Sequence, residues 1–433
     1  MRVVVVGAGL AGLAAVCRLA DLGCEVELVE RSRLLGGKAT SFSVDGVEVD
    51  NGQHIHLGCC TDYLDFVDRL GMSDVLWNQP RFEVTVLGRG ARPAHLRATR
   101  GLPASLSLLP SFARYSHLPM SAKLEVARAL RRCGDPSRPG ETFAAWLSRH
   151  GQGAAAVHGF WDVFVVPALN ARIDEVSAED ALFVVRTAFA GDDVRAARIG
   201  WSRVPLARIA EAAAARAHAV RTRTTVVSLL DSGDSVSGVR CADGEEIAAD
   251  AVILAVPPAR LRALLGNPAE FGVDGLGEFR SRAIVDVHLW FDTPDAGLPF
   301  AAILGSPIQW VFEKRPGYLC CSLSAADQLV TRPESELVEL CRAELAAAWP
   351  RLNTVRLARG AVTRDPEATF VPTPGLHRPG ARTTRANLTI AGAWTATGWP
   401  ATMESAVRSG RRAVDGLALA PIAAGRVLEA VHG

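Results

Sequence analysis

Three glycines near the beginning of the chain have the spacing of a phosphate-binding turn. Val3–Val6 is a short apolar run typical of a strand buried in a parallel sheet, and apolar residues then recur with helical spacing over 10–22. Between them, Gly7 permits a tight turn, Gly9 lets the backbone approach a pyrophosphate, and Gly12 allows close packing of helix on strand. The helix N-terminus offers free N–H groups and a positive dipole end to the phosphates. The pattern predicts a dinucleotide-binding βαβ unit; the alternative is a glycine-rich turn without a ligand.

An acidic residue and a second glycine pair follow at the expected places. Glu30 closes the second predicted strand, 25–30, where a carboxylate accepts hydrogen bonds from ribose hydroxyls. Gly36, Gly37 and Lys38 come next, and in many flavoproteins a Gly-Gly-Arg in this position passes along the pyrophosphate. Lys38 would supply the positive charge there, although without the bidentate fork of arginine. The alternative is a loop with a solvated lysine.

The C-terminal region contains another strand, turn and helix. A strand is predicted over 388–391, a turn rich in glycine and tryptophan follows, and a helix begins near Met403. The N–H groups of that helix would point at the carbonyls of a flavin ring and stabilise the charge of the reduced form. The alternative is an ordinary capped helix against which tryptophans pack.

Composition excludes several classes of protein. The chain has 433 residues, 49% of them hydrophobic, and a formal net charge of +1, so no global field favours nucleic acid as a partner. The nine cysteines form no CxxC pattern, so neither a metal site nor a disulfide framework is expected. The glycines at the N-terminus argue against a signal peptide, and no apolar run is long enough to span a membrane. We expect a cytoplasmic protein, with attachment to the inner face of the membrane left open.

These motifs resemble those of a known superfamily. GAGLAG at 7–12, ERSRLLGGKATSF at 30–42 and TIAGAWTATGWPATMESAVRSG at 389–410 resemble the flavin amine oxidases and carotenoid desaturases. The segment DNGQH at 50–54, continued by IHLGCCTDYLDFVDRLG, is similar to the squalene-associated desaturase group, the hydroxysqualene dehydroxylases. The resemblance implies FAD as cofactor and the reduction of hydroxysqualene to squalene, with loss of water, in squalene and hopanoid formation.

The resemblance also implies roles for single residues. The ADP half of FAD would be contacted by Gly7, Ala8, Gly9, Gly12, Glu30, Gly37 and Lys38. Val226 would touch the adenine, Gly52 and Met403 would lie by the flavin ring, and Gly392 would belong to the same site. Ala393 follows Gly392 where superfamily members often have an acidic residue, so one hydrogen bond to the cofactor must be made by water or a backbone group.

The element pattern and the resemblance together predict an α/β fold with two interleaved domains. A Rossmann-type FAD/NAD(P)-binding domain would comprise 1–75, 203–272 and 372–433. Within it, a helix over 206–218 would lead into a parallel strand over 224–230. An α+β substrate domain would comprise 76–202 and 273–371, beginning with a mainly helical insertion.

The implied substrate is a long-chain isoprenoid, an allylic C30 alcohol. Ionisation of its C–O bond would leave a delocalised cation, which a hydride from reduced flavin quenches, and an electron donor must then reduce the flavin again. A general acid is needed, and His54 and Asp50 are the candidates. His54 is equally well explained as a histidine bonded to backbone at a turn, and Asn51 and Gln53 as residues that orient the hydroxyl or cap that turn.

Some aromatic residues are expected to line an apolar tunnel, although an ordinary core explains most of them better: Trp161, Phe164, Trp201, Trp290, Trp310, Phe312 and Trp394. The segment 102–131 combines apolar faces, prolines and basic residues. It suits a membrane-surface opening for an insoluble substrate, or else a plain amphipathic helical lobe.

The sequence leaves three other functions open. A phytoene-type carotenoid desaturase would keep the flavin and reverse the chemistry, and DNGQH favours the dehydroxylase over it. An amine oxidase would require an aromatic cage facing the flavin. A flavin- or nucleotide-binding partner without activity is the third.

Overall fold

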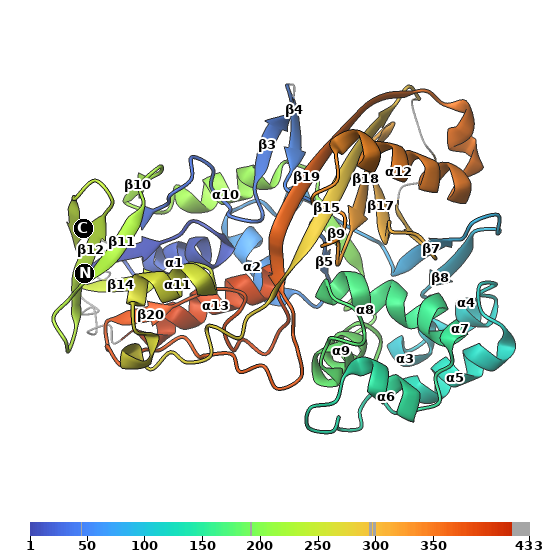
Figure 1. Cartoon of the computed structure of the whole chain (residues 1–433), viewed down its shortest axis with the longest axis horizontal. Helices are drawn as coiled ribbons and strands as arrows, with labels where there is room; N and C mark the ends of the chain where they lie inside the picture. Colours follow the sequence, from blue (N-terminus) through green and yellow to red (C-terminus); the bar gives the residue numbers. More distant parts are fainter. Residues whose placement is uncertain (45, 191–192, 294–296, 298–299, 418–433) are drawn as a thin grey trace, which may run out of the picture.

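The computed structural model describes residues 1–44, 46–190, 193–293, 297 and 300–417. The predicted stretch 418–433 of the first domain lies outside the described residues. A five-stranded parallel sheet lies on the left of Figure 1 and a seven-stranded sheet with a helical lobe on the right. No helix of the described part is long and apolar enough to cross a membrane.

The parallel sheet is built from strands that are far apart in sequence. In spatial order they are β10 (Ala219–Arg221), β2 (Glu25–Val29), β1 (Arg2–Val6), β14 (Ala251–Leu254) and β20 (Leu388–Ile390). Four of the five β1 residues are buried, because both faces of the sheet are covered. Val3 and Val5 face a layer of four helices: α1 (Leu10–Asp21), α2 (Thr61–Arg69), α10 (Leu206–Ala214) and α13 (Met403–Gly416).

The opposite face of this sheet carries a small antiparallel sheet and one helix. Val4 and Val6 pack there against β11 (Val226–Asp231), β12 (Val236–Cys241), β13 (Glu246–Ala248) and α11 (Pro258–Leu265). The strand predicted over 224–230 is therefore β11 of the antiparallel sheet. The parallel strand after α10 is β10, whose three residues are too few to give an apolar pattern.

The seven-stranded sheet is mostly antiparallel. Its order is β19 (Leu357–Phe370), β15 (Ser281–Phe291), β18 (Tyr318–Leu323), β17 (Trp310–Arg315), β16 (Phe300–Ile303), β7 (Glu83–Leu87) and β8 (Ala94–Arg97). Side chains alternate between its faces. Val285, Val287 and Leu289 of β15 pack toward α12 (Glu334–Ala348), whereas Ile284 and Asp286 line a cavity on the other face.

Helices cover the remaining part of that face. Trp310 and Phe312 share a hydrophobic core with the helical lobe. The lobe comprises α3 (Ala104–Ser107), α4 (Leu109–Ala113), α5 (Met120–Leu130), α6 (Phe143–Arg149), α7 (Ala154–Ala156), η2 (Val157–Trp161), α8 (Asp162–Leu169), α9 (Ala178–Val185) and η3 (Arg186–Ala190). Figure 1 shows it below the seven-stranded sheet.

Short elements connect the two regions. They are β3 (Ser41–Val44) paired with β4 (Val47–Asp50), and β5 (His56–Leu57) and β6 (Leu76–Asn78) paired with β9 (Ile199–Ser202). Single 3₁₀ turns complete the described chain: η1 (Ser73–Val75), η4 (Pro268–Phe271) and η5 (Pro350–Thr354). β4 and β5 flank the DNGQH segment, so its backbone is held at both ends.

Candidate functional site

The turn between β1 and α1 opens into a large cavity of about 1310 Å³. Gly9 is the N-cap of α1 and has no capping side chain, so the first N–H groups of the helix are left for another acceptor. A Cβ atom built on Gly9 would meet no atom within 4 Å, and Gly9, Leu10 and Ala11 all line the cavity. Open space in front of free helix N–H groups fits a pyrophosphate.

The other two glycines of the turn are required by close packing. Gly7 has φ +103°, and its Cβ would lie 2.4 Å from the carbonyl oxygen of Ala255. The Cβ of Gly12 would lie 1.9 Å from the carbonyl oxygen of Gly7. Gly7 lines the cavity, whereas Ala8 and Gly12 do not. Ala8 donates its N–H to Glu30 and Gly12 packs against Gly7, so both residues support the turn from behind.

Glu30 lies at the cavity wall where the ribose was predicted. Its two carboxylate oxygens accept the N–H groups of Ala8 and Ser32, each at 2.8 Å. Each oxygen keeps a lone pair, so the carboxylate can still accept hydroxyl groups. These two bonds fix the orientation of the carboxylate before a ligand arrives.

Lys38 has a partner that the sequence did not indicate. Its ammonium lies 3.0 Å from the carboxylate of Asp365 on β19 and also donates to the carbonyl of Glu367. The ammonium group that was predicted to meet the pyrophosphate is therefore already paired with an acid of the seven-stranded sheet. Gly37 lies beside the turn itself, since its Cβ would approach the Cα of Gly9 to 2.9 Å.

Three further predicted cofactor residues line the same cavity: Val226, Gly392 and Met403. Val226 begins β11, and its carbonyl accepts the guanidinium of Arg260 at 2.6 Å. Gly392 donates its N–H to the Ser409 hydroxyl at 2.8 Å, and a Cβ there would strike the Trp394 indole at 2.2 Å.

The turn before α13 is held by one partly buried arginine. The Arg378 guanidinium donates to four backbone carbonyls, those of Ala393, Trp394, Thr395 and Trp399. Burial lowers the pKa of Arg378 to about 10. Ala393, which stands where superfamily members often have an acidic residue, is held in this turn through its backbone carbonyl.

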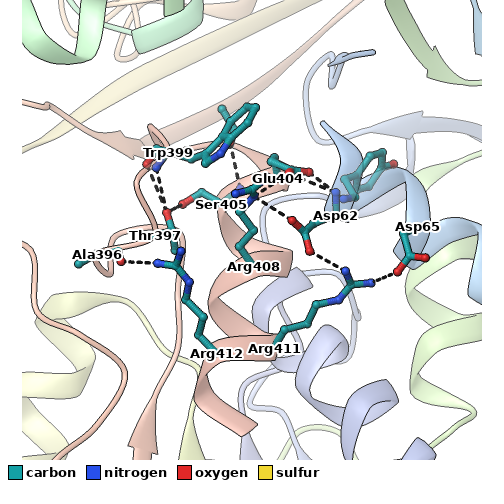
Figure 2. Close-up of polar contacts among 12 residues, drawn as sticks. Asp62, Asp65, Ala396, Thr397, Trp399, Glu404, Ser405, Arg408, Arg411 and Arg412 are labelled. Carbon is teal, nitrogen blue, oxygen red and sulfur yellow. Dashed lines mark hydrogen bonds and ion pairs between the residues drawn. The ribbon is translucent and has the colours of Figure 1, made fainter. Parts of the chain in front are cut away.

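A polar network then ties α13 to α2 (Figure 2). Glu404 is fully buried and accepts the N–H groups of Asp62 and Tyr63 in the first turn of α2, at 3.2 and 2.8 Å. Arg408 bonds both Glu404 and Asp62, and its guanidinium lies over the Trp399 ring. Because α2 follows DNGQH in the chain, this network sets the distance between the two segments predicted to flank the flavin ring.

Asp50 cannot be the general acid. It is buried, does not line the cavity, and accepts the Ser41 hydroxyl at 2.7 Å, the Leu206 N–H at 3.0 Å and the Lys314 ammonium at 3.0 Å. Burial alone would raise its pKa, but Lys314 and the two hydrogen bonds hold it below the usual value. Asp50 is an ionised anchor for the start of α10.

His54 does line the cavity, and Gly52 lies two residues before it. The His54 Nδ1 atom lies 3.2 Å from the Gly52 carbonyl, which can only accept, so Nδ1 carries the proton and Nε2 keeps its lone pair. Burial lowers the pKa of His54, so the ring is neutral at neutral pH. The arrangement matches the turn histidine considered as an alternative and makes His54 an acceptor rather than an acid.

Asp286 is one of the titratable cavity residues that the sequence did not indicate. It lies on the cavity face of β15, 2% exposed, and burial raises its pKa to about 6. The only sequence signal was an acid within the mostly apolar strand β15. Side chains alternate between the two faces of a strand, but this alternation does not reveal which face lines a cavity.

The far end of the cavity is apolar and aromatic. Of the predicted rings, Phe164, Trp310, Phe312 and Trp394 line it. Trp161 is buried in the core of the lobe, Trp201 lies against Trp77 and Trp290 stacks on Tyr318, which agrees with the alternative of ordinary packing for these three. Six further aromatic rings that no sequence pattern indicated also line the cavity: Phe82, Phe183, Phe189, Phe279, Phe370 and Trp399.

Comparison with known proteins agrees with this site. The profile of the flavin containing amine oxidoreductase family matches residues 10–418. A hydroxysqualene dehydroxylase of Rhodopseudomonas palustris is 31% identical, and one of Sinorhizobium fredii is 30% identical; each comparison covers 95% of this chain and 97% of the relative. A 15-cis-phytoene desaturase of Synechococcus elongatus is 24% identical over 95% of this chain and 94% of its own.

Among solved structures, putrescine oxidase bound to putrescine has the same fold, with a TM-score of 0.70 at 18% identity over 96% of this chain and 98% of its own. The predicted α/β fold and FAD cofactor are confirmed. The free N–H groups and open space at Gly9 fit that cofactor. The chain belongs to the flavin containing amine oxidoreductase family and is an FAD-dependent oxidoreductase.

Proposed function

We propose that this protein reduces hydroxysqualene to squalene, with loss of water. The observation that carries the proposal is that one cavity includes both the glycine turn and a long aromatic end, lined by rings such as Phe164, Phe189 and Trp310. At about 1310 Å³ it exceeds the ~300–1,000 Å³ of ordinary ligand pockets, which suits a dinucleotide together with a long apolar substrate. The two relatives named hydroxysqualene dehydroxylase support the same substrate.

In this proposal the residues of the glycine turn hold the ADP half of FAD. Gly7 and Gly9 face the pyrophosphate, Ala8 and Gly12 support the turn, Glu30 accepts the ribose hydroxyls, and Gly37 and Lys38 close the loop. Val226 faces the adenine, and Gly52, Gly392 and Met403 lie toward the flavin ring. Bound FAD, once reduced by an external donor, supplies a hydride.

The chain's own contribution at the substrate end is to exclude water and to favour a cation. The Phe164 ring lies 5.1 Å from Phe189 and 6.4 Å from Trp310, centroid to centroid, so three aromatic rings, each with two π faces, lie together at this end of the cavity. An allylic cation next to such faces is stabilised by the negative π surface. The phenyl rings of Phe164 and Phe189 offer no hydrogen bonds to water, which helps to protect the cation from capture by it.

We also propose that the substrate arrives from a membrane surface. Five large apolar side chains of the lobe are more than one-third exposed: Leu102, Leu106, Leu109, Met120 and Leu124. Arg114 and Lys123 lie among them in sequence and Arg100 just before them, and a surface that is both apolar and basic suits an anionic bilayer.

The first experiment reduces the purified holoprotein without oxygen and adds hydroxysqualene. We expect the absorbance of oxidised flavin to return while squalene forms, detected by mass spectrometry. Reduced flavin with unchanged substrate would refute the proposal.

The similarity to a phytoene desaturase supports desaturation of a polyene precursor as a second candidate function. The same purified holoprotein can be used to test it. Oxidised holoprotein is mixed with phytoene, and bleaching of the flavin with formation of a longer polyene would favour a desaturase.

A further inference from the structure

An unpaired carboxyl lies beside the DNGQH turn. Asp286 reaches it from β15, since a Cβ on Gly52 would lie 2.6 Å from the Asp286 Oδ2 atom. Gly52 has φ +86°, a conformation that favours glycine, so both the backbone and the neighbouring carboxyl exclude a side chain there. Asp286 therefore meets the cavity next to the residue proposed to face the flavin ring.

The surroundings of Asp286 favour its protonated form. Oδ1 accepts the Gln53 N–H at 3.2 Å, the Ser322 hydroxyl on the neighbouring strand β18 also hydrogen-bonds the carboxyl group, and the Cys320 thiol lies 3.9 Å away. Within the described part of the chain no cation is ion-paired with Asp286, because the nearby Lys314 bonds Asp50 instead. Burial outweighs the hydrogen bonds and Lys314, and it raises the pKa to about 6.

A second polar atom at this place has no partner. The Gln53 side-chain oxygen is buried and accepts no hydrogen bond from the described residues, while its amide nitrogen donates to the His54 carbonyl at 3.3 Å. Gln53 also lines the cavity. A buried acceptor without a partner costs about 1–3 kcal/mol unless a ligand satisfies it, and a substrate hydroxyl would do so.

We propose that Asp286 is the acid that protonates the leaving hydroxyl, while Gln53 orients that hydroxyl. This inference rests on the proposed dehydroxylation. The carboxyl O–H bond breaks, a new O–H bond forms on the substrate oxygen, and the C–O bond breaks with its electron pair leaving on water. The carbon then takes the hydride that reduced FAD supplies, so the products are squalene, water, oxidised FAD and the Asp286 carboxylate.

Other titratable groups near Asp286 are unsuited to the role. Asp50 is ionised and paired with Lys314 of β17, and His54 donates Nδ1–H to backbone. His288, two residues along β15, is bonded to the Tyr318 hydroxyl at 2.8 Å and to Thr363 at 3.3 Å, and burial lowers its pKa to about 4. On β18, burial raises the pKa of Cys320, so its thiol stays protonated but is a far weaker acid.

The test compares Asp286→Asn with the wild type in single turnover. Anaerobically reduced holoprotein is mixed with hydroxysqualene, and flavin reoxidation and squalene are followed together. We expect the variant to be at least about 100-fold slower, the lower range of general acid catalysis. The wild-type rate should fall as pH rises through the pKa of Asp286, and the variant rate should not. Asp180→Asn is the matched control, because burial also raises the pKa of that carboxyl but it lies outside the cavity lining.

A second readout does not depend on turnover. Infrared difference spectra of the oxidised holoprotein between about pH 5 and about pH 8 should show a carboxylic acid band that is lost as pH rises and is missing in Asp286→Asn. If the Asn variant does not retain FAD, Asp286→Ala is assayed with added formic acid, which should restore part of the rate.

The outcomes separate the two proposals. A wild type that never converts hydroxysqualene refutes the dehydroxylation, while the infrared band still reports the protonation of Asp286. A working wild type matched within a few-fold by Asp286→Asn overturns the role of Asp286. The role of Asp286 is also overturned if the infrared spectra show no carboxylic acid band specific to Asp286. It is overturned as well if formic acid does not restore the rate of Asp286→Ala.

Discussion

The two ends of the cavity are built in different ways. At the phosphate end the backbone makes the site, and Gly7, Gly9 and Gly12 matter because they lack side chains. At the substrate end side chains make the site, and Asp286, Gln53 and the rings come from strands and loops far apart in sequence. A backbone site leaves a fixed spacing in the sequence, whereas a side-chain site is assembled only by the tertiary fold.

The largest expected loss of stability comes from removing Glu404 from the polar network that joins α13 to α2. Glu404→Ala would leave two N–H groups of α2 without an acceptor and would remove one of the two carboxylate partners of Arg408, the other being Asp62. Removing one member of a buried charged network costs about 3–5 kcal/mol. Chemical denaturation should show this loss, and Glu336→Ala, in the first turn of α12 outside the network, is the control. A loss below ~1 kcal/mol would mean that α13 is held by packing alone.

Asp286→Asn should stabilise the protein at neutral pH, in contrast to its expected effect on turnover. Because burial raises the folded-state pKa to about 6, ionised Asp286 penalises the fold, and stability falls as pH rises from about 4 to about 6. The variant lacks this penalty, so above pH ~6 it should be up to about 3 kcal/mol more stable. The gap should close near pH ~4 in unfolding experiments across this range. Equal stability at both pH values would contradict the buried-acid assignment.

The glycine turn offers a matched pair of substitutions. Gly12→Ala forces a methyl group against the Gly7 carbonyl and should cost about 1–3 kcal/mol in the flavin-free protein. Gly9→Ala points into open space, so it should leave that stability unchanged and weaken FAD binding instead. Thermal unfolding and FAD titration separate the two effects. Loss of stability in both variants would show that Gly9 is also a packing residue.

The smallest expected effect lies outside the cavity. Leu106 and Leu109 are 46% and 50% exposed, whereas Leu108 packs on the core of the lobe. Leu106→Asp with Leu109→Asp should reduce flotation with anionic liposomes several-fold and leave the flavin spectrum unchanged. Val194→Asp with Val227→Asp, at exposed apolar sites elsewhere, is the control. Equal flotation of both double variants would exclude this surface.

The sequence predicted the fold class and the cofactor because both depend on local patterns. The apolar runs, the glycine spacing and Glu30 each lie within a short stretch of chain. The same reasoning failed where a distant partner decides the role. Lys38 is paired with Asp365, Asp50 with Lys314, and only the pairing of β15 with β18 and β19 turns Asp286 toward the cavity. The strand β10 was missed because three residues carry too little pattern.

The order of strands in the parallel sheet has a consequence for synthesis of the protein. β1 lies beside β14, and β14 beside β20, which begins only at Leu388. The glycine turn emerges from the ribosome long before the helix α13 that packs against α1. Folding during translation therefore cannot complete the cofactor site early, because domains form as units only once their segments are available. Nascent chains should stay dependent on chaperones until α13 is released, and capture of FAD would mark the end of that period.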